Sequence, residues 1–206
     1  MTRFIEEVRT DWQANSGLSL DSLKARLLTA EIRGEQAAYR WRQASPGPVR
    51  NAAWAAIRFA GSIVQWRLFS CEIPGSAQIG RGLRLPHPQN IIIGYTASIG
   101  DSCSIYHNTT VARSTFRSTS STARIGDRVL IGAGAIIVGE VEIGDDAVVA
   151  AGAVVTHSVP AAHLVVSPQP ELRPRSPLPG AEDAEFRYPN PHPRARAERD
   201  SAEHRG

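Results

Sequence analysis

From residue 71 to about residue 166, an aliphatic residue returns every six positions and is often followed by glycine. Three sets share this period: Ile73, Ile79 and Leu85; Ile93, Ile99, Ile105 and Val111; and Ile125, Ile131, Ile137, Ile143, Val149 and Val155. Neither an α-helix, with 3.6 residues per turn, nor a strand of period two gives this spacing. With six residues per face and three faces per coil, it predicts a left-handed parallel β-helix of about four coils, whose aliphatic side chains stack inside.

The residues before the repeats, 1–70, show apolar positions at α-helical spacing. These positions are Ile5, Val8 and Trp12, then Leu20, Leu23, Leu27 and Leu28, and finally Trp54, Ile57, Val64 and Leu68. The segment 45–48, rich in proline and glycine, separates the second helix from the third. Ser19 or Asp21 is expected to cap the second helix. We expect the aromatic side chains of these helices to serve packing.

The chain therefore divides into an α-helical N-terminal segment, 1–70, a β-helix domain, 71–166, and a tail, 167–206. The tail holds eight of the fourteen prolines, mixed with Arg, Glu and Asp, and has almost no aliphatic residues. Such a composition cannot bury a core and predicts disorder. The expected fold class is mainly β, a left-handed parallel β-helix preceded by helices.

The composition excludes several classes of protein. A formal net charge of only +3, spread along the chain, does not indicate binding to nucleic acid. The N-terminus lacks the apolar run of a signal peptide, and the most apolar stretch, 51–69, is interrupted by Arg58, Gln65 and Arg67, which argues against a membrane span. Cys71 and Cys103 lie in apolar repeats and are expected to be buried free thiols. These features favour the cytoplasm.

The six-residue register breaks twice. Two extra residues fall between Leu85 and Ile93, and thirteen residues, 112–124, separate Val111 from Ile125. An interruption in so regular a solenoid leaves the stack as a loop, and such loops are where solenoids usually place function.

The first break contains His87, flanked by prolines. His107 follows twenty residues later; without the two extra residues the separation is eighteen, one full coil, so both histidines should lie near one corner. Glu72 lies fifteen residues before His87, almost one coil back. A carboxylate that accepts the Nδ1 proton of His87 would fix its tautomer, and the other nitrogen would then remove a proton from an acceptor hydroxyl.

Two other interpretations of these histidines stay open at this point: a structural role for His87, and a metal bound between His87 and His107. The four remaining histidines lie at the end of the solenoid or in the tail, where solvation is expected. The sequence has no Ser–His–Asp pattern, no phosphate loop and no zinc-ligand spacing, and no metal is expected.

The run EIPGSAQIGRGLRLPHPQNIIIG, with the later IGDSCSIYHNTTV and IGDRVLIGAGAIIVGEVEIGDDAVVAAGAVVTHSVP, resembles the serine O-acetyltransferase family. The likeness runs from about residue 72 to 160, and the short helical N-terminal segment resembles the family's short form. Hexapeptides alone would indicate only an acyltransferase-like solenoid. Three further features make the resemblance to serine O-acetyltransferases more specific: the segment with His87, the loop of matching length and the IGAGA run.

The resemblance implies a catalytic pair. A histidine at the position of His87 deprotonates the serine hydroxyl, which attacks the thioester of acetyl-CoA, and a carboxylate at the position of Glu72, usually aspartate, forms a dyad with it. The pantetheine arm would lie in a groove between neighbouring β-helices near Ala133 and Ala151. The groove implies a homotrimer, or a hexamer made of two trimers.

The predicted site follows from these matches. Its catalytic residues are His87 and Glu72; its supporting or substrate-binding residues are His107, Asn90, Arg113 and Arg117; its acetyl-CoA-binding residues are Ala133, Gly134, Ala151 and Gly152. Acetyl-CoA is expected as a substrate.

The second loop departs from the family. Where the family has an Asp-Arg-His-Pro end that helps to hold serine, the chain has residues 120–123, Ser-Ser-Thr-Ala, and Arg113, Arg117 or Arg124 would have to replace the arginine. Pro86 stands where the family commonly has aspartate. These changes point towards a related branch, the acetyltransferases of exopolysaccharide clusters such as those of colanic acid biosynthesis. That branch resembles this chain in the short helical N-terminus, in Glu-Ile-Pro at the start of the β-helix and in a histidine like His107. The chain ends in Arg-Gly, not isoleucine, so no complex with O-acetylserine sulfhydrylase is expected.

Three functions are therefore considered. The first is an acetyl-CoA-dependent O-acetyltransferase acting on L-serine or a similar small hydroxyl compound. The second is an O-acetyltransferase acting on a sugar, an exopolysaccharide precursor or another hydroxyl metabolite. The third is a catalytically silent trimeric scaffold that kept the fold.

Overall fold

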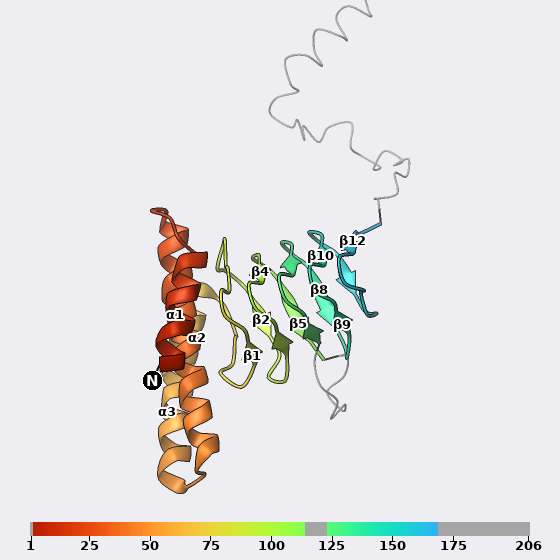
Figure 1. The fold of residues 1–206 in the computed structure, drawn as a ribbon. Coiled ribbons are helices and arrows are strands. Elements are labelled where there is room, and N and C mark those ends of the chain that lie inside the picture. The colour runs from red at the N-terminus through yellow and green to blue at the C-terminus, as the bar shows by residue number, and fades with distance from the viewer. Residues whose placement is uncertain (1, 114–122, 169–206) are drawn as a thin grey trace, which may run out of the picture. The chain divides into compact units, whose positions relative to one another are not determined.

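Our computed structural model describes residues 2–113 and 123–168 (Figure 1). The helices are α1 (Thr2–Ala14), α2 (Leu20–Ala44) and α3 (Pro48–Val64), followed by the π-helical turn η1 (Gln65–Phe69). Ser19, not Asp21, caps α2, because its hydroxyl accepts a hydrogen bond from Ser22 N at 3.1 Å. Pro48 lies in the first turn of α3, where its missing N–H costs nothing.

Short parallel strands form the second part of the described chain. They are β1 (Gln78–Ile79), β2 (Ile92–Ile93), β3 (Ser98–Ile99), β4 (Ser104–Ile105), β5 (Thr110–Ala112), β6 (Arg124–Ile125), β7 (Leu130–Ile131), β8 (Ile136–Val138), β9 (Glu142–Ile143), β10 (Val148–Val149), β11 (Val154–Val155) and β12 (Leu164–Val165). They make three four-stranded sheets, in the orders β1-β3-β6-β9, β12-β10-β7-β4 and β11-β8-β5-β2. Consecutive strands thus lie in different sheets, and the chain winds in coils.

The register of the coils reveals both breaks. Leu130 pairs with Val148, eighteen positions later, as expected for one coil. Gln78 pairs with Ser98, twenty positions later, so the first break adds two residues. Ser98 pairs with Arg124, twenty-six positions later, so the second loop adds eight residues to a coil. The interior of that loop, 114–122, and the tail predicted to be disordered lie outside the described residues, apart from 167 and 168.

The thirteen aliphatic positions of the six-residue repeat form the core. All of them are buried, with exposed fractions from 0% at Ile131 to 8% at Ile79. The predicted inward stacking is confirmed, and three parallel sheets built from hexapeptides fit the predicted left-handed β-helix. The prediction of a mainly β fold holds only for this part, because α2 alone has 25 residues whereas each strand has two or three.

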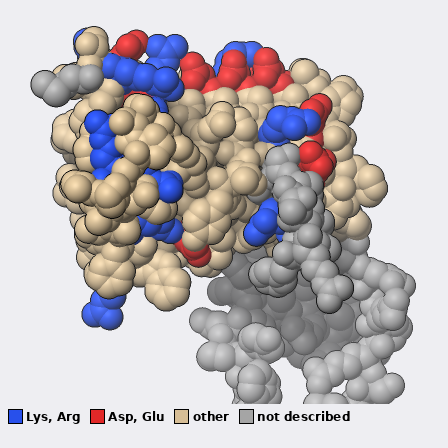
Figure 2. All heavy atoms as spheres, turned by 90° about the horizontal axis from the view of Figure 1, so that it is seen from below, with Lys and Arg blue, Asp and Glu red and all other residues tan. Residues whose placement is uncertain are grey.

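One corner of the β-helix is held by stacked aspartates. Asp101 Oδ1 accepts from Arg81 N at 2.7 Å, Asp127 Oδ1 from Asp101 N at 2.7 Å, and Asp145 Oδ1 from Asp127 N at 2.8 Å. Each carboxylate therefore satisfies a turn N–H one coil away. Acidic and basic side chains gather along one edge of the molecule in Figure 2. No helix in the described part of the chain is long and apolar enough to cross a membrane.

The helices bind the first coil through polar side chains. Gln65 donates to Ile73 O at 3.0 Å and accepts from Ile73 N at 2.7 Å. Gln36 donates to Ala77 O at 2.9 Å, and Arg33 donates to Ile79 O at 2.7 Å. Because no coil precedes the first one, these side chains take the place of a neighbouring strand and satisfy its edge.

This arrangement reverses the expected packing of the helices. Trp12 is 47% exposed, Leu23 is 51% exposed and Leu27 is 54% exposed, although Leu28 is fully buried. The buried positions of α2 include Arg33, Glu35 and Gln36. Trp12, one of the aromatic side chains expected to serve packing, is therefore about half exposed in the single chain, because the β-helix edge requires polar partners.

Candidate active site

His87 lies where the first coil leaves the regular register. Gln89 N donates to His87 O at 2.8 Å, which closes a tight turn, and Asn90 follows in the left-handed region with φ of 53°. Asn90 N in turn donates to Phe69 O at 3.0 Å. The break predicted from the sequence thus becomes a turn that presents a half-exposed imidazole.

Asp21, in the first turn of α2, is the hydrogen-bond partner of His87. The distance from Asp21 Oδ2 to His87 Nδ1 is 3.0 Å, with the side chains 41% and 53% exposed. An ionised carboxylate only accepts hydrogen bonds, so this contact requires the proton on Nδ1. Nε2 is then the nitrogen that can accept a proton from another molecule.

His107 lies against His87 on the next coil. The ring centroids are 5.6 Å apart, and the planes meet at 80°. The Tyr106 ring lies 6.3 Å from that of His87. His107 Nδ1 is buried and has no hydrogen-bond partner among the described residues. The structure therefore brings together the two histidines that coil arithmetic placed at one corner.

Glu72 does not bond to His87. Its Oε1 accepts from the Tyr95 hydroxyl at 3.2 Å, and its backbone forms a parallel bridge with Ile92. The His87–carboxylate pair in this structure is therefore formed with Asp21. Sequence reasoning missed Asp21 because it lies 66 residues from His87, outside the repeats, and only its place after a capping serine marked it.

The remaining predicted supporting residues lie in different places. Asn90 Nδ2 donates to Asn108 Oδ1 at 2.9 Å, next to the histidine pair. Arg113 is exposed just after β5. Arg117 lies outside the described residues. The two asparagines thus lie at the same corner of the β-helix as His87 and His107.

The residues predicted to contact acetyl-CoA continue the same corner along the solenoid. Asn108 N donates to Gln89 O at 3.1 Å, Gly134 N to His107 O at 3.0 Å, and Gly152 N to Ala133 O at 2.8 Å. Gly134 and Gly152 have φ of +71° and +69°, a conformation that favours glycine. Ala151 is exposed beside Gly152. One edge therefore runs along four successive coils, which these three hydrogen bonds join, and the histidine pair lies on the first two of them.

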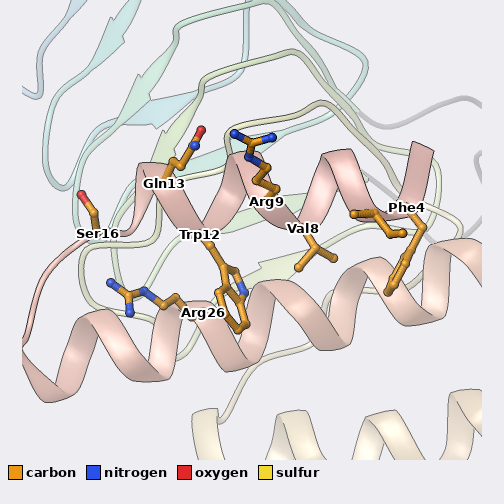
Figure 3. A pocket seen from close by; sticks show the side chains of 8 residues that line it. Phe4, Val8, Arg9, Trp12, Gln13, Ser16 and Arg26 are labelled. Atoms are coloured by element: carbon orange, nitrogen blue, oxygen red, sulfur yellow. The ribbon is translucent and has the colours of Figure 1, made fainter. Parts of the chain in front are cut away.

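A hollow of the described surface lies away from this corner. An apolar hollow of about 500 Å³ is lined by α1 residues, including Phe4, Val8 and Trp12, with Arg26 of α2 (Figure 3). None of the predicted site residues lines it, and its lining offers no group that could act as a base. Among residues 2–113 and 123–168, no cluster of three or more His, Cys, Asp or Glu side chains is arranged to hold a metal ion.

Comparison with known proteins agrees with this fold. Residues 122–157 match the family model "Bacterial transferase hexapeptide (six repeats)". Serine acetyltransferase 1 of Arabidopsis thaliana is 48% identical over 93 residues, which cover 45% of this chain and 30% of that protein. The serine acetyltransferase of Mycobacterium tuberculosis is 37% identical over 99 residues, which cover 48% and 43%. The chain thus spans less than half the length of these relatives.

Solved structures extend the likeness to the helices. The serine acetyltransferase of Neisseria gonorrhoeae superposes with a TM-score of 0.68 and 26% identity, covering 91% of this chain and 71% of that one. The soybean apoenzyme gives 0.68 and 29%, covering 82% and 68%. Fold and repeats together resemble those of hexapeptide-repeat transferases. The relatives and solved structures named here, to which the chain is similar, are serine acetyltransferases.

Proposed function

We propose that this chain is an acetyl-CoA-dependent O-acetyltransferase that transfers the acetyl group to the hydroxyl of L-serine, with His87 as general base. The observation that carries the proposal is the half-exposed His87, whose Nδ1 bonds to a carboxylate and whose Nε2 is left to accept a proton. The names of the relatives supply the acceptor: those reported above are serine acetyltransferases. They do not favour a sugar acceptor or a silent scaffold.

The reaction needs one proton relay. His87 Nε2 removes the proton of the serine hydroxyl while the oxygen forms a bond to the thioester carbonyl carbon of acetyl-CoA. Backbone N–H groups stabilise the oxyanion that forms. The carbon–sulfur bond then breaks, and the thiolate of coenzyme A takes the proton back from the imidazolium. O-acetylserine and free coenzyme A leave, and His87 is neutral again.

Acetyl-CoA is proposed to lie along the corner that contains Ala133, Gly134, Ala151 and Gly152. A corner of small residues lets a ligand approach the backbone closely, and Ala151 and Gly152 are exposed. This corner is continuous with His107 through the hydrogen bond from Gly134 N. A thioester bound here would therefore lie near the histidine pair, and holding the two reactants together would supply a large part of the rate.

The proposed assembly is a homotrimer whose neighbouring β-helices form the acetyl-CoA groove. The apolar side chains of the helices, such as Trp12, Leu23 and Leu27, are half exposed in the single chain and would be available for the association of two trimers into a hexamer. The two cysteines are free and buried, which suits a reducing cytoplasm. No complex with O-acetylserine sulfhydrylase is proposed.

Thiol release from acetyl-CoA tests the function directly. The full chain is offered L-serine, L-homoserine and several sugars in turn, and calorimetry measures acetyl-CoA binding. We expect activity to be highest with L-serine, and His87→Ala to lower kcat about a hundredfold or more while acetyl-CoA still binds. Wild-type activity in His87→Ala would refute the mechanism, faster turnover of a sugar would refute the acceptor, and failure to bind acetyl-CoA would favour a scaffold.

A further inference from the structure

Helix α3 packs against the rest of the chain with its polar side. Arg58 Nη1 donates to Glu35 Oε1 of α2 at 3.4 Å, and Gln65, which directly follows α3, donates to Ile73 O of the first coil at 3.0 Å. Gly61 lies on the same side, where a Cβ would clash with the carboxylate of Glu35. Positions three and four apart share one side of a helix, so the side of α3 that contacts α2 and the first coil is polar.

The opposite side of α3 is apolar and exposed. Phe59 is 70% exposed, and Trp66 in η1 is 68% exposed. The exposed apolar residues recur every three or four positions: Val49, Ala52, Ala56, Phe59, Ile63 and Trp66. A helix at the surface of a protein normally buries its apolar side. Because α3 exposes that side along its whole length, the patch marks an interaction surface.

The segment that carries this apolar face is basic. Residues 36–71 contain five arginines and no lysine, aspartate or glutamate. Arg42 Nε donates to Asn51 Oδ1 at 2.7 Å, and Arg50 Nη1 donates to Trp41 O at 3.0 Å. These acceptors are neutral, so the contacts orient the two guanidinium groups without balancing their charge.

The arginines lie at both ends of the apolar face. Arg42 and Arg50 flank the turn between α2 and α3, and Arg67 is exposed in η1. The 17 residues of α3 separate these ends by about 25 Å. Trp41 and Trp66 lie at the same two ends and are exposed. An apolar helix face bordered by arginine and tryptophan is typical of helices that lie in a membrane–water interface.

We propose that α3 and η1 form a membrane-binding face, which lies in the plane of a bilayer that contains anionic phospholipids. Phe59, Ile63 and Trp66 enter the boundary between headgroups and acyl chains, and the arginines bind lipid phosphate groups. The three helices lie across one end of the β-helix and the coils extend away from them (Figure 1), so the coils stay in water. The proposal goes beyond acetyl transfer and does not depend on it.

A second copy of the chain suits this face less well than a lipid surface. In a two-fold contact the same patch of each copy faces the other. The arginines of both copies would then come together, and residues 36–71 offer no carboxylate to offset them. The phosphate groups of anionic lipids supply the missing negative charge.

Flotation of the full chain with vesicles tests the proposal. Vesicles of phosphatidylcholine mixed with phosphatidylglycerol are compared with vesicles of phosphatidylcholine alone. We expect binding to the anionic vesicles to be about tenfold stronger or more, and to weaken as salt screens the arginines. Lipids brominated on their acyl chains should quench tryptophan fluorescence, and Trp66→Phe should lose part of this quenching.

The apolar contribution is tested with a matched pair of exposed side chains. Phe59→Ser should weaken vesicle binding about tenfold or more, because less apolar surface leaves water. Its melting temperature should stay that of the wild type, since the side chain is mostly exposed. Leu164→Ser is the control: Leu164 is 64% exposed in β12, in the last coil, and its replacement should leave vesicle binding unchanged.

The basic contribution is tested with variants of equal net charge. Arg42→Gln/Arg67→Gln should weaken binding to the anionic vesicles about tenfold or more. Arg124→Gln/Arg128→Gln removes the same charge from the surface of the stack, where the two arginines pair with Glu142 and Asp146, and should change binding less than about twofold.

Four results would overturn the proposal. It fails if the chain binds neither kind of vesicle, or binds both equally. It fails if Phe59→Ser and Leu164→Ser weaken binding alike, or if brominated lipids quench no tryptophan. Light scattering covers the competing occupant: a lower molar mass of Phe59→Ser, with no vesicle binding by the wild type, would assign the face to a contact between copies. Loss of acetyl transfer in His87→Ala leaves all of these measurements unchanged.

Discussion

The stacked coils and the helix-covered first coil satisfy their backbone hydrogen-bonding groups in opposite ways. Within the stack, each coil satisfies the backbone of the next, as in the bond of 2.7 Å from Gly132 N to Val149 O, and aliphatic residues fill the interior. At the first coil, the side chains of Arg33, Gln36 and Gln65 make the hydrogen bonds that the backbone of a preceding coil would otherwise make. The stack is repetitive and apolar, whereas the junction is specific and polar.

The difference shows where sensitivity to mutation and function should concentrate. A repeat can be replaced by a similar repeat, but each bond at the junction is made by one particular side chain. The same junction carries Asn15 and Asp21 to the residues around His87. Matched substitutions in the two regions therefore test best whether sensitivity to mutation concentrates at the junction.

The largest expected effect on the free energy of unfolding is at Arg33. Its side chain is fully buried and bonds to Asp11 Oδ2 at 2.7 Å and to Ile79 O at 2.7 Å. Arg33→Met should lower the free energy of unfolding by about 3–5 kcal/mol, because the buried carboxylate loses its partner. Burial already raises the pKa of Asp11. Urea titration followed by circular dichroism gives the value.

The matched control for Arg33 is Arg128→Met. Arg128 is about half exposed and pairs with Asp146 on the surface of the stack. Its replacement should leave the unfolding midpoint unchanged within error. Equal destabilisation of the two variants would show that the junction is no more sensitive to such a substitution than the surface of the stack.

A smaller effect on the free energy of unfolding, which depends on pH, is expected at Glu31. Burial, and then the charge of Glu35, raise the Glu31 pKa from its ordinary 4.5 to about 8, while Gln65 Nε2 donates to its Oε2 at 2.8 Å. Because the pKa is higher in the folded chain, the stability from neutral Glu31 is complete below about pH 4.5 and is lost as pH rises towards 8. Glu31→Gln is neutral throughout, and its amide can donate to Glu35.

The prediction at Glu31 is therefore a stabilising substitution. After allowance for its partly exposed side chain, Glu31→Gln should be more stable than the wild type by roughly 2 kcal/mol on the alkaline side and equal to it in acid. Thermal melts across the pH range measure the difference. A constant difference at every pH would contradict the shared burial of the two carboxylates.

The sequence predicted the stack better than the junction, for a physical reason. Periodicity reports which positions face inward, so Ile131 and its equivalents could be assigned, and coil arithmetic placed His87 beside His107. Nothing periodic links Asp21 to His87, because their contact depends on how the helices dock. The apolar pattern of α1 and α2 also misled, since most of its positions are exposed and only Leu28 is fully buried.

The smallest expected effect is at the helix cap. Ser19 Oγ accepts from Ser22 N at 3.1 Å, and Ser19→Ala should cost about 1 kcal/mol of unfolding free energy. Ser19→Asp, which keeps an acceptor at the cap, is the control and should preserve the melting temperature. If Ser19→Ala melts like the wild type, the cap does not help to fix the first turn of α2.

The most direct test of the account is the tautomer of His87 in the folded chain. Imidazole nitrogen chemical shifts, measured by NMR on protein labelled at histidine and assigned with His87→Ala, distinguish a protonated Nδ1 from a protonated Nε2. We predict that His87 carries its proton on Nδ1 in mildly alkaline solution and that Asp21→Asn moves it towards Nε2. A proton on Nε2 in the wild type, or a tautomer that Asp21→Asn leaves unchanged, would contradict the account.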